Sequence, residues 1–181
     1  MTVSTGRGRT VALMLESDGP GGAENMLLQL AEQLASRGYS ICPVLPAKGL
    51  GWLAKEFRGR GFEPETFTLR RPIDWRCLSG MLEVLRRRRV DLIHSHEFTM
   101  AFYGAAAAAL LRRPHFITIH GGRHPLAHWR RRVAYRWAIR HSRAAVAVSA
   151  ATRDIFAEAL RLPRDAIQIV HNGIQPPPYR F

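Results

Sequence analysis

The sequence predicts a single α/β domain built on a doubly wound, mostly parallel, Rossmann-like sheet with helices on both faces. Three observations lead to this fold class. Short apolar segments alternate with amphipathic ones from residue 10 to residue 170, glycine and polar residues separate them, and 181 residues are enough for one well-buried domain. Strands joined by helices of this length need right-handed crossovers, which produce a parallel sheet covered on both sides.

The first part of the chain has strand and helix patterns in turn. Thr10–Leu15 is an apolar run before a glycine-rich turn, as expected for a buried strand. In Ala23–Arg37 apolar residues recur at helical spacing, and Gly38 follows as a C-terminal cap. The next predicted elements are the strand Tyr39–Leu45, the helix Gly51–Arg60 and the strand Phe62–Leu69.

The second part continues the alternation. The predicted helix Asp74–Arg89 ends in arginines, which suit the negative end of its dipole. The elements expected after it are the strand Val90–His94, the helix Thr99–Leu111, the strand His115–His120, the helix Leu126–His141, the strand Ala144–Ser149, the helix Ala150–Leu160 and the strand Ile167–Val170. The proline-rich segment 171–181 is predicted to be a linker that follows a domain of residues 1–170.

The net charge of +13 comes almost entirely from arginine. Arginine binds phosphate through a planar fork, so anionic lipid, nucleotide and nucleic acid all remain open as partners. A GC-rich genome would explain the arginine bias but not the excess of positive charge. No apolar run approaches the length that spans a bilayer, and the N-terminus lacks a signal-peptide core. Cys42 and Cys77 lack metal-type spacing, which favours reduced thiols in a cytoplasmic protein.

The turn after the first predicted strand is a candidate phosphate-binding loop. Gly21 and Gly22 would let the backbone approach an anion at the start of the next helix. Glu24 stands where the dinucleotide fingerprint needs its last glycine, and no Gly-Lys-Ser/Thr sequence follows. NAD and P-loop binding are therefore disfavoured, while a tight turn that merely needs glycine remains the simpler alternative.

Histidines end two of the predicted strands. His94 and His96 lie two residues apart, so they share one side of a strand, but no third metal ligand is evident and we predict no metal. His120 precedes Gly121, and its imidazole can donate a hydrogen bond to a sugar hydroxyl or accept one. The simpler alternative for His120 is a histidine that caps a turn.

Two later segments each admit a structural and a functional interpretation. Ser149, with Thr152 and Asp154 after it, is typical of a helix N-terminal cap, which can still face a ligand cleft. The helix around Trp129–Arg140 mixes arginine with aromatic residues, as in a helix that binds an anionic membrane or nucleic acid. The favoured interpretation is a core helix. The side chains expected on its apolar face are Val133, Trp137 and Ile139.

Taken together, five segments resemble the N-terminal domain of the family 4 (group 1) glycosyltransferases. They occur in the family's order and extend over almost the whole chain. These segments are Gly21–Glu24, Asp91–Glu97, Thr118–Gly121, Val148–Asp154 and Val170–Ile174. The resemblance implies a GT-B architecture, in which two Rossmann-like domains enclose a cleft and a sugar passes from a nucleotide donor with retention of configuration, without a metal or other cofactor.

The resemblance also assigns roles to individual residues. His120 would be the catalytic residue that contacts the donor sugar. The residues implied to approach the donor phosphates are Gly21, Gly22 and Ala23. The residues implied on the acceptor side are Glu24, His96, Glu97, Gly121, Ser149 and Thr152. Asn172 and Gly173 would form the hinge to a second domain.

The sequence therefore predicts the acceptor-side half of a retaining glycosyltransferase, acting on a glycan, lipid or small-molecule acceptor. The half with the family's Glu-x7-Glu motif does not occur in these residues, so we expect little activity from this chain alone. One alternative is a non-catalytic subunit that partners a separate donor-binding chain. Another, less favoured, is a basic nucleic-acid-binding domain.

The expected location is cytoplasmic, with peripheral binding to an anionic inner membrane face left open by the positive charge. The candidate membrane contacts fall on two predicted helices. They are Trp52, Lys55 and Arg58 on the first and Arg130, Arg131 and Arg132 on the second.

Overall fold

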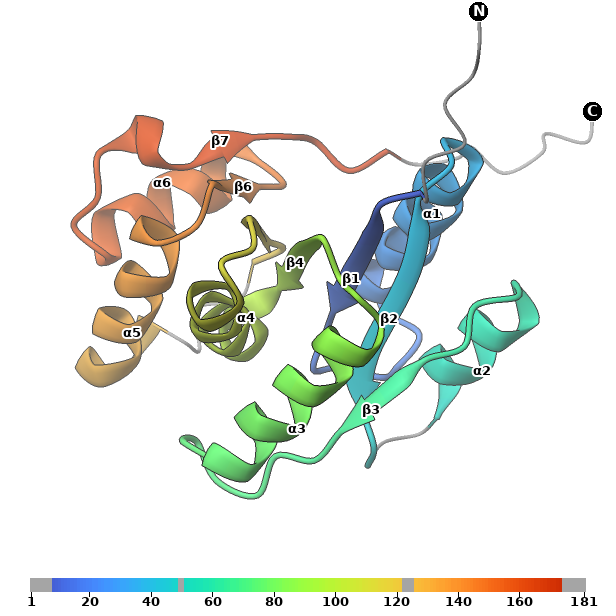
Figure 1. Ribbon diagram of the computed structural model, residues 1–181. Coiled ribbons are helices and arrows are strands. Elements are labelled where there is room, and N and C mark those ends of the chain that lie inside the picture. The colour runs from blue at the N-terminus through green and yellow to red at the C-terminus, as the bar shows by residue number, and fades with distance from the viewer. Residues whose placement is uncertain (1–7, 49–50, 122–125, 174–181) are drawn as a thin grey trace, which may run out of the picture.

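A computed structural model describes residues 8–48, 51–121 and 126–173 of the chain (Figure 1). Its sheet has seven strands in the order β3-β2-β1-β4-β5-β6-β7, and every neighbouring pair is parallel. Figure 1 shows helices on both sides of this sheet. The predicted fold class, a doubly wound Rossmann-like domain, is confirmed.

The strands follow the predicted order along the chain. Their bounds are Thr10–Met14 (β1), Ser40–Pro46 (β2), Glu65–Phe67 (β3), Leu92–His96 (β4), His115–Ile119 (β5), Ala144–Ala147 (β6) and Gln168–Ile169 (β7). The helices are Gly22–Ser36 (α1), Trp52–Gly59 (α2), Trp75–Arg87 (α3), Glu97–Leu111 (α4), Trp129–Arg140 (α5) and Ala150–Ala159 (α6), with a short 3-10 helix at Arg164–Ala166 (η2).

Two strands differ most from the sequence-based expectation, and in both the number of neighbouring strands is the reason. β3 is shorter than predicted because it is an edge strand that pairs only with β2. β4 runs on to His96 instead of ending at His94, because it lies between β1 and β5 and both neighbours offer partners. Consequently α4 begins at Glu97, directly after the strand and two residues earlier than predicted.

The two faces of β1 lie in different parts of the core. Val11 and Leu13 pack in a cluster with side chains of α1 and α2. Ala12 and Met14 pack on the opposite face with side chains of α3 and α4. A further cluster joins β5 and β6 to α5 and α6. Helices therefore bury both faces of the sheet, as the uniformly apolar β1 predicts.

The loop after β1 is fixed to the start of α2 by one buried carboxylate. Asp18 accepts hydrogen bonds from the backbone N–H groups of Gly51, at 2.5 Å, and Leu53, at 2.7 Å. These N–H groups belong to the helix terminus, where no intrahelical acceptor exists. The side chain thus caps α2 from a distance and holds in place the loop that leads to the glycine turn.

Candidate functional site

The carboxyl ends of β1, β4 and β5 meet at the middle of the sheet, where the chain order changes direction between β1 and β4. Ligands in doubly wound folds bind at this switch point. The structure brings His96 and Glu97 at the end of β4 beside His120 at the end of β5. The glycine turn that starts α1 follows β1 at the same edge.

Three histidines form a stacked cluster at this edge. The His96 Nδ1 atom lies 3.0 Å from His120 Nε2, and the two ring centroids are 5.3 Å apart. The His94 ring also packs against His96, with a centroid distance of 4.3 Å and a tilt of 33°, and its Nε2 lies 2.8 Å from Thr118 Oγ1. The prediction that His94 and His96 share one side of the strand is confirmed.

The burial of these rings assigns their tautomers. Among the described residues, neither His96 Nε2 nor His120 Nδ1 has a hydrogen-bond partner. Both atoms are buried, so whichever of them carries the ring hydrogen is an enclosed donor without an acceptor among these residues, which costs about 1–3 kcal/mol. His96 is completely buried whereas His120 is partly exposed, so only His120 Nδ1 can reach an acceptor on a ligand, and we place the hydrogen of His96 on Nδ1, donating to His120 Nε2. His120 then has its own hydrogen on Nδ1, as a donor with no acceptor among these residues.

Desolvation keeps the cluster neutral. Burial lowers the pKa of His94 to about 4 and that of His120 to about 4, and the pKa of His96 lies well below its ordinary value for the same reason. Buried His115, whose Nε2 lies 2.9 Å from Ser95 Oγ, has a pKa lowered by burial to about 3. At neutral pH His120 is thus an uncharged imidazole.

These pKa shifts predict acid-sensitive folding. Unfolded histidines bind protons near pH 6.5, whereas the folded cluster resists protonation down to about pH 4. The unfolded state therefore binds more protons in this window, and the free energy of unfolding should fall as the pH falls, by about 1.4 kcal/mol per pH unit for each excess proton. Urea denaturation between pH 7 and pH 4 measures the slope.

His115→Gln should reduce this slope by about one proton, because its neutral amide no longer distinguishes the folded from the unfolded state. Glu97 acts in the opposite sense, since its pKa is raised by folding, and it reduces the net slope by about one proton between pH 4.5 and pH 7. A stability that stays constant from pH 6.5 to pH 4 would contradict the buried neutral histidines.

Glu97 combines an unusual backbone with an unusual pKa. Its φ is 65°, in the left-handed region, which costs a non-glycine residue about 1–3 kcal/mol. Its Oε1 accepts the backbone N–H of His120 at 3.2 Å. Burial raises the pKa of Glu97 to about 7, helped by the nearby carboxylates of Glu24 and Glu16 and opposed by the His120 hydrogen bond. Near neutral pH this carboxyl group can either donate or accept a proton.

The glycine turn before α1 makes room for the Glu24 carboxylate at one glycine and is open to a ligand at the other. Gly21 precedes α1, and a Cβ atom there would collide with the carboxylate of buried Glu24. A Cβ atom on Gly22 would meet nothing within 4 Å, so the backbone there is accessible. Gly21 provides no side-chain cap, and the N–H groups of Gly22 and Ala23 lie in the first turn of α1.

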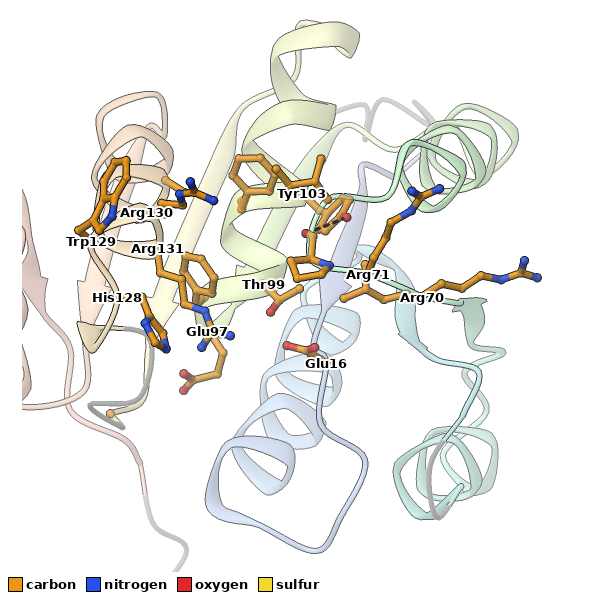
Figure 2. Close-up of a pocket in the computed structure, with 17 residues that line it drawn as sticks. Glu16, Arg70, Arg71, Glu97, Thr99, Tyr103, His128, Trp129, Arg130 and Arg131 are labelled. Atoms are coloured by element: carbon orange, nitrogen blue, oxygen red, sulfur yellow. Dashed lines mark hydrogen bonds between the residues drawn. The ribbon is translucent and has the colours of Figure 1, made fainter.

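A large cavity of about 1060 Å³ opens beside this edge, and Figure 2 shows its lining. Glu97 and Gly121, both predicted on the acceptor side, line it. Arg130 and Arg131 extend from α5 on one side, and Arg70 and Arg71 lie on the other. The remaining lining residues are Glu16, Leu69, Pro72, Ile73, Phe98, Thr99, Phe102, Tyr103, His128, Trp129 and Ala134.

The predicted cap at the start of α6 is confirmed. Ser149 Oγ accepts the backbone N–H of Thr152 at 3.1 Å and donates to the Thr152 hydroxyl at 3.0 Å. Neither residue lines the large cavity. Asn172 and Gly173 are exposed beyond β7, and the proline-rich part of the predicted linker lies outside the described residues.

The apolar face predicted for α5 is partly wrong. Val133 is 60% exposed, whereas Tyr135, Ala138 and Ile139 are buried and Trp137 is half-buried. Tyr135 lies two residues after Val133, so their side chains point about 200° apart around the helix and cannot share one face. The buried face of α5 is therefore the one that carries Tyr135, and Val133 lies on the exposed face among the arginines.

Sequence patterns gave no signal for the wall that Arg70 and Arg71 form. That wall is a loop between β3 and α3, held by Asp74, which accepts the backbone N–H groups of Arg70, at 3.1 Å, and Arg76, at 3.0 Å. The Tyr103 hydroxyl accepts the backbone N–H of Asp74 at 2.8 Å and donates to the Pro72 carbonyl at 3.3 Å. An Asp before a helix is a recognisable cap, but its long-range partner Tyr103 has no sequence signature.

Two kinds of feature do not occur among the described residues. No three His, Cys, Asp or Glu side chains gather as a bound metal ion would require. None of the helices in the described ranges is both long and apolar enough to cross a bilayer.

Solved structures resemble this chain along most of its length. HepE from Anabaena, in complex with UDP and glucose, matches 92% of this chain and 45% of its own, with 20% identity and a TM-score of 0.72. A glycosyltransferase from Rickettsia africae matches 92% of this chain and 44% of its own, at 17% identity and a TM-score of 0.77. MurG from Acinetobacter baumannii matches 92% of this chain and 47% of its own, at 14% identity and a TM-score of 0.67.

The chain thus spans about half the length of these structures, as expected for one half of a GT-B fold. A search of curated proteins finds no match. The sequence profile of Glycosyltransferase Family 4 matches residues 20–176. Because this match includes most of the 181 residues, the protein belongs to glycosyltransferase family 4.

Proposed function

We propose that this chain is the acceptor-side half of a retaining glycosyltransferase that uses a nucleotide-sugar donor. The observation that carries the proposal is the convergence of His120, Glu97 and the open start of α1 at the switch point of the sheet, next to a large cavity. Family membership and the UDP and glucose bound to HepE support the donor class. The acceptor enters the cavity, and a second domain closes over it from beyond Asn172 and Gly173.

In this proposal the donor diphosphate lies at the first turn of α1. The accessible backbone at Gly22, with the N–H groups of Gly22 and Ala23, accommodates negative charge at the positive end of the helix dipole. Gly21 has a separate role, since it leaves room for the Glu24 carboxylate. Most cationic groups that stabilise the departing diphosphate belong to the other domain.

His120 and Glu97 lie between the two substrates. A rotation of the partly exposed His120 ring uncovers its Nδ1 hydrogen, which donates to a hydroxyl of the donor sugar, and Glu97 holds the acceptor hydroxyl. The acceptor oxygen bonds to the anomeric carbon as the bond from that carbon to the diphosphate oxygen breaks. The acceptor oxygen approaches on the face of the sugar from which the diphosphate departs, so the sugar keeps its configuration, and the acceptor proton passes to the departing nucleoside diphosphate. His96 acts as a positioning residue, because its Nδ1 fixes the tautomer of His120.

Donor binding by this chain alone should be weak, since the base and ribose contacts are assigned to the other domain. Titration calorimetry with uridine and guanosine diphosphate sugars should give affinities no better than about millimolar, or about −4 kcal/mol. Micromolar binding would contradict the division of the donor site between two halves. It would also remove the reason to expect little activity from the isolated chain.

Two alternatives make different predictions. A non-catalytic subunit would require a separate donor-binding chain that copurifies with this one and restores sugar transfer. A nucleic-acid-binding domain would bind single or double strands tightly, with a steep dependence on salt. The family match and the cavity favour the enzyme over both.

We extend the proposal to peripheral binding at an anionic membrane, through α5 rather than α2. Trp52 packs against the core and Arg58 pairs with Glu63 at 3.2 Å, so α2 is poorly suited. On α5, Trp129 is 63% exposed beside Arg130. Aromatic side chains enter the lipid interface, and each arginine near an anionic leaflet contributes about 1 kcal/mol.

Sedimentation with vesicles tests this extension. The chain should bind vesicles with anionic lipid and not neutral ones, and binding should weaken as salt rises from about 10 to 150 mM. Trp129→Ala should reduce the bound fraction, whereas Lys55→Gln on α2 should not. Indifference to vesicle charge at low salt would contradict membrane binding.

A further inference from the structure

A second cavity continues the candidate acceptor site away from Glu97. It has a volume of about 250 Å³ and shares Ile73, Phe102 and Tyr103 with the lining of the large cavity. From these shared residues it extends towards α3 and the middle of α5. The other residues that line it are Asp74, Trp75, Leu78, Ala106 and Trp137. The two cavities adjoin at these three side chains, and we call them together the path, with Glu97 and Gly121 lining one part and Trp75 and Trp137 the other.

The far part of this path is suited to an apolar chain. Its lining is aliphatic or aromatic except for the Tyr103 hydroxyl and Asp74. The Asp74 carboxylate already accepts backbone N–H groups of Arg70, Arg76 and Cys77, and the Tyr103 hydroxyl is bonded on both sides by backbone groups. No polar ligand group is therefore needed there.

Exposed apolar side chains stand along the same path. Trp75 is 75% exposed and Ile73 is 60% exposed, and both line the second cavity. Trp129, 63% exposed, lines the large one. Single exposed apolar side chains are common on protein surfaces, whereas a group of three around adjoining cavities is typical of a surface that an apolar ligand covers.

The part of the path nearer Glu97, which is the large cavity, is suited to an anion. Arg70, Arg71 and Arg130 line the large cavity, and no ion pair within the described ranges involves them. Figure 2 shows Glu16 and Glu97 towards one end of the cavity and Arg130 with Trp129 towards the other. The Arg130 guanidinium is thus separated from the carboxylates of Glu16 and Glu97 and lies next to the apolar path.

We infer that the acceptor is an anionic amphiphile, a phosphate-bearing molecule with an apolar chain. Its phosphate binds Arg130, its chain runs past Phe102 towards Trp75, and its hydroxyl reaches Glu97. Arginine binds phosphate in two-pronged fashion, and the aromatic lining removes the chain from water. The role of the ligand as acceptor rests on the proposed function, whereas its binding can be measured independently.

Binding of three probes to the 181-residue chain tests the inference. Farnesyl phosphate has both parts, farnesol has the chain alone, and inorganic phosphate has the anion alone, each used below its aggregation concentration. Trp75, Trp129 and Trp137 line the path and report binding through their fluorescence. Farnesyl phosphate should bind at least about 10-fold more tightly than either of the other probes.

Single substitutions separate the two parts of the site. Arg130→Gln should lower the affinity for farnesyl phosphate about 10-fold and leave the affinity for farnesol unchanged. Arg140→Gln is the control and should change neither affinity, because Arg140 lies at the end of the same helix and outside both cavities. Trp75→Ala should lower the affinity for both farnesyl phosphate and farnesol. Leu110→Ala is its control, because Leu110 is likewise an exposed apolar residue, at 60%, but lines neither cavity.

The possible failures are distinguishable. Equal affinity for farnesol and farnesyl phosphate, or no binding of farnesyl phosphate, would overturn the inference. So would a soluble sugar phosphate that binds as tightly through Arg130, with no gain from an apolar chain. That last result would leave the acceptor-side assignment intact, whereas micromolar binding of nucleotide sugars by this chain would count against the proposed function itself.

Discussion

Replacing His120 with alanine should lower the rate of glycosyl transfer about 100- to 1,000-fold in an enzyme that joins this chain to a donor-binding half. The variant removes the Nδ1 hydrogen that lacks an acceptor among the described residues and that we assign to the donor sugar. Loss of one preorganised donor at a reaction centre has an effect of this size. Steady-state kinetics should show the loss mainly in kcat, since the contact strengthens in the transition state.

Two amides at the same position identify the ring atom responsible. The Asn side-chain nitrogen can take the place of Nδ1, so His120→Asn should recover part of the rate lost by His120→Ala. The longer Gln reaches towards Nε2, which already pairs with His96, so His120→Gln should recover less. His141→Ala is the control, because His141 is exposed at the end of α5 and bonds only its own helix. Equal activity of all three variants would contradict the assigned tautomer.

Gly104→Ala should destabilise the fold by about 2–4 kcal/mol, although alanine is the better helix former. Gly104 lies inside α4, where a Cβ atom would collide with Ser95 Oγ and approach His115 Nε2 to 2.7 Å. Both partners are buried and lie 2.9 Å apart in a hydrogen bond. Overpacking costs about 1–3 kcal/mol and disturbing a buried hydrogen bond a similar amount, against a gain of about 1 kcal/mol in helix propensity.

Gly80→Ala is the matched control for this substitution. Gly80 is an exposed glycine inside α3, and a Cβ atom there would meet nothing within 4 Å. It should therefore stabilise the protein by about 0.4–1 kcal/mol. Urea denaturation of both variants measures the difference. If Gly104→Ala matched Gly80→Ala in sign, α4 would not pack as closely on β4 and β5 as described.

The sequence alone predicted the order of strands and helices, most of their bounds to within two residues, and the placing of His96 and His120 at strand ends. These features depend on local patterns: apolar runs such as Thr10–Leu15, helical spacing, and a cap such as Ser149 that acts on its own helix. The parallel sheet followed, because few connections are possible between strands separated by helices.

The tertiary structure alone decided what these residues do to one another. The neighbouring positions of β4 and β5 bring the His96 ring to the His120 ring, and burial there makes both rings neutral and raises the pKa of Glu97. The cavity wall at Arg70 depends on Tyr103, whose partner Asp74 lies 29 residues earlier in the chain. Such contacts depend on distance in space and on loss of water, and neither is encoded in the spacing of residues along the chain.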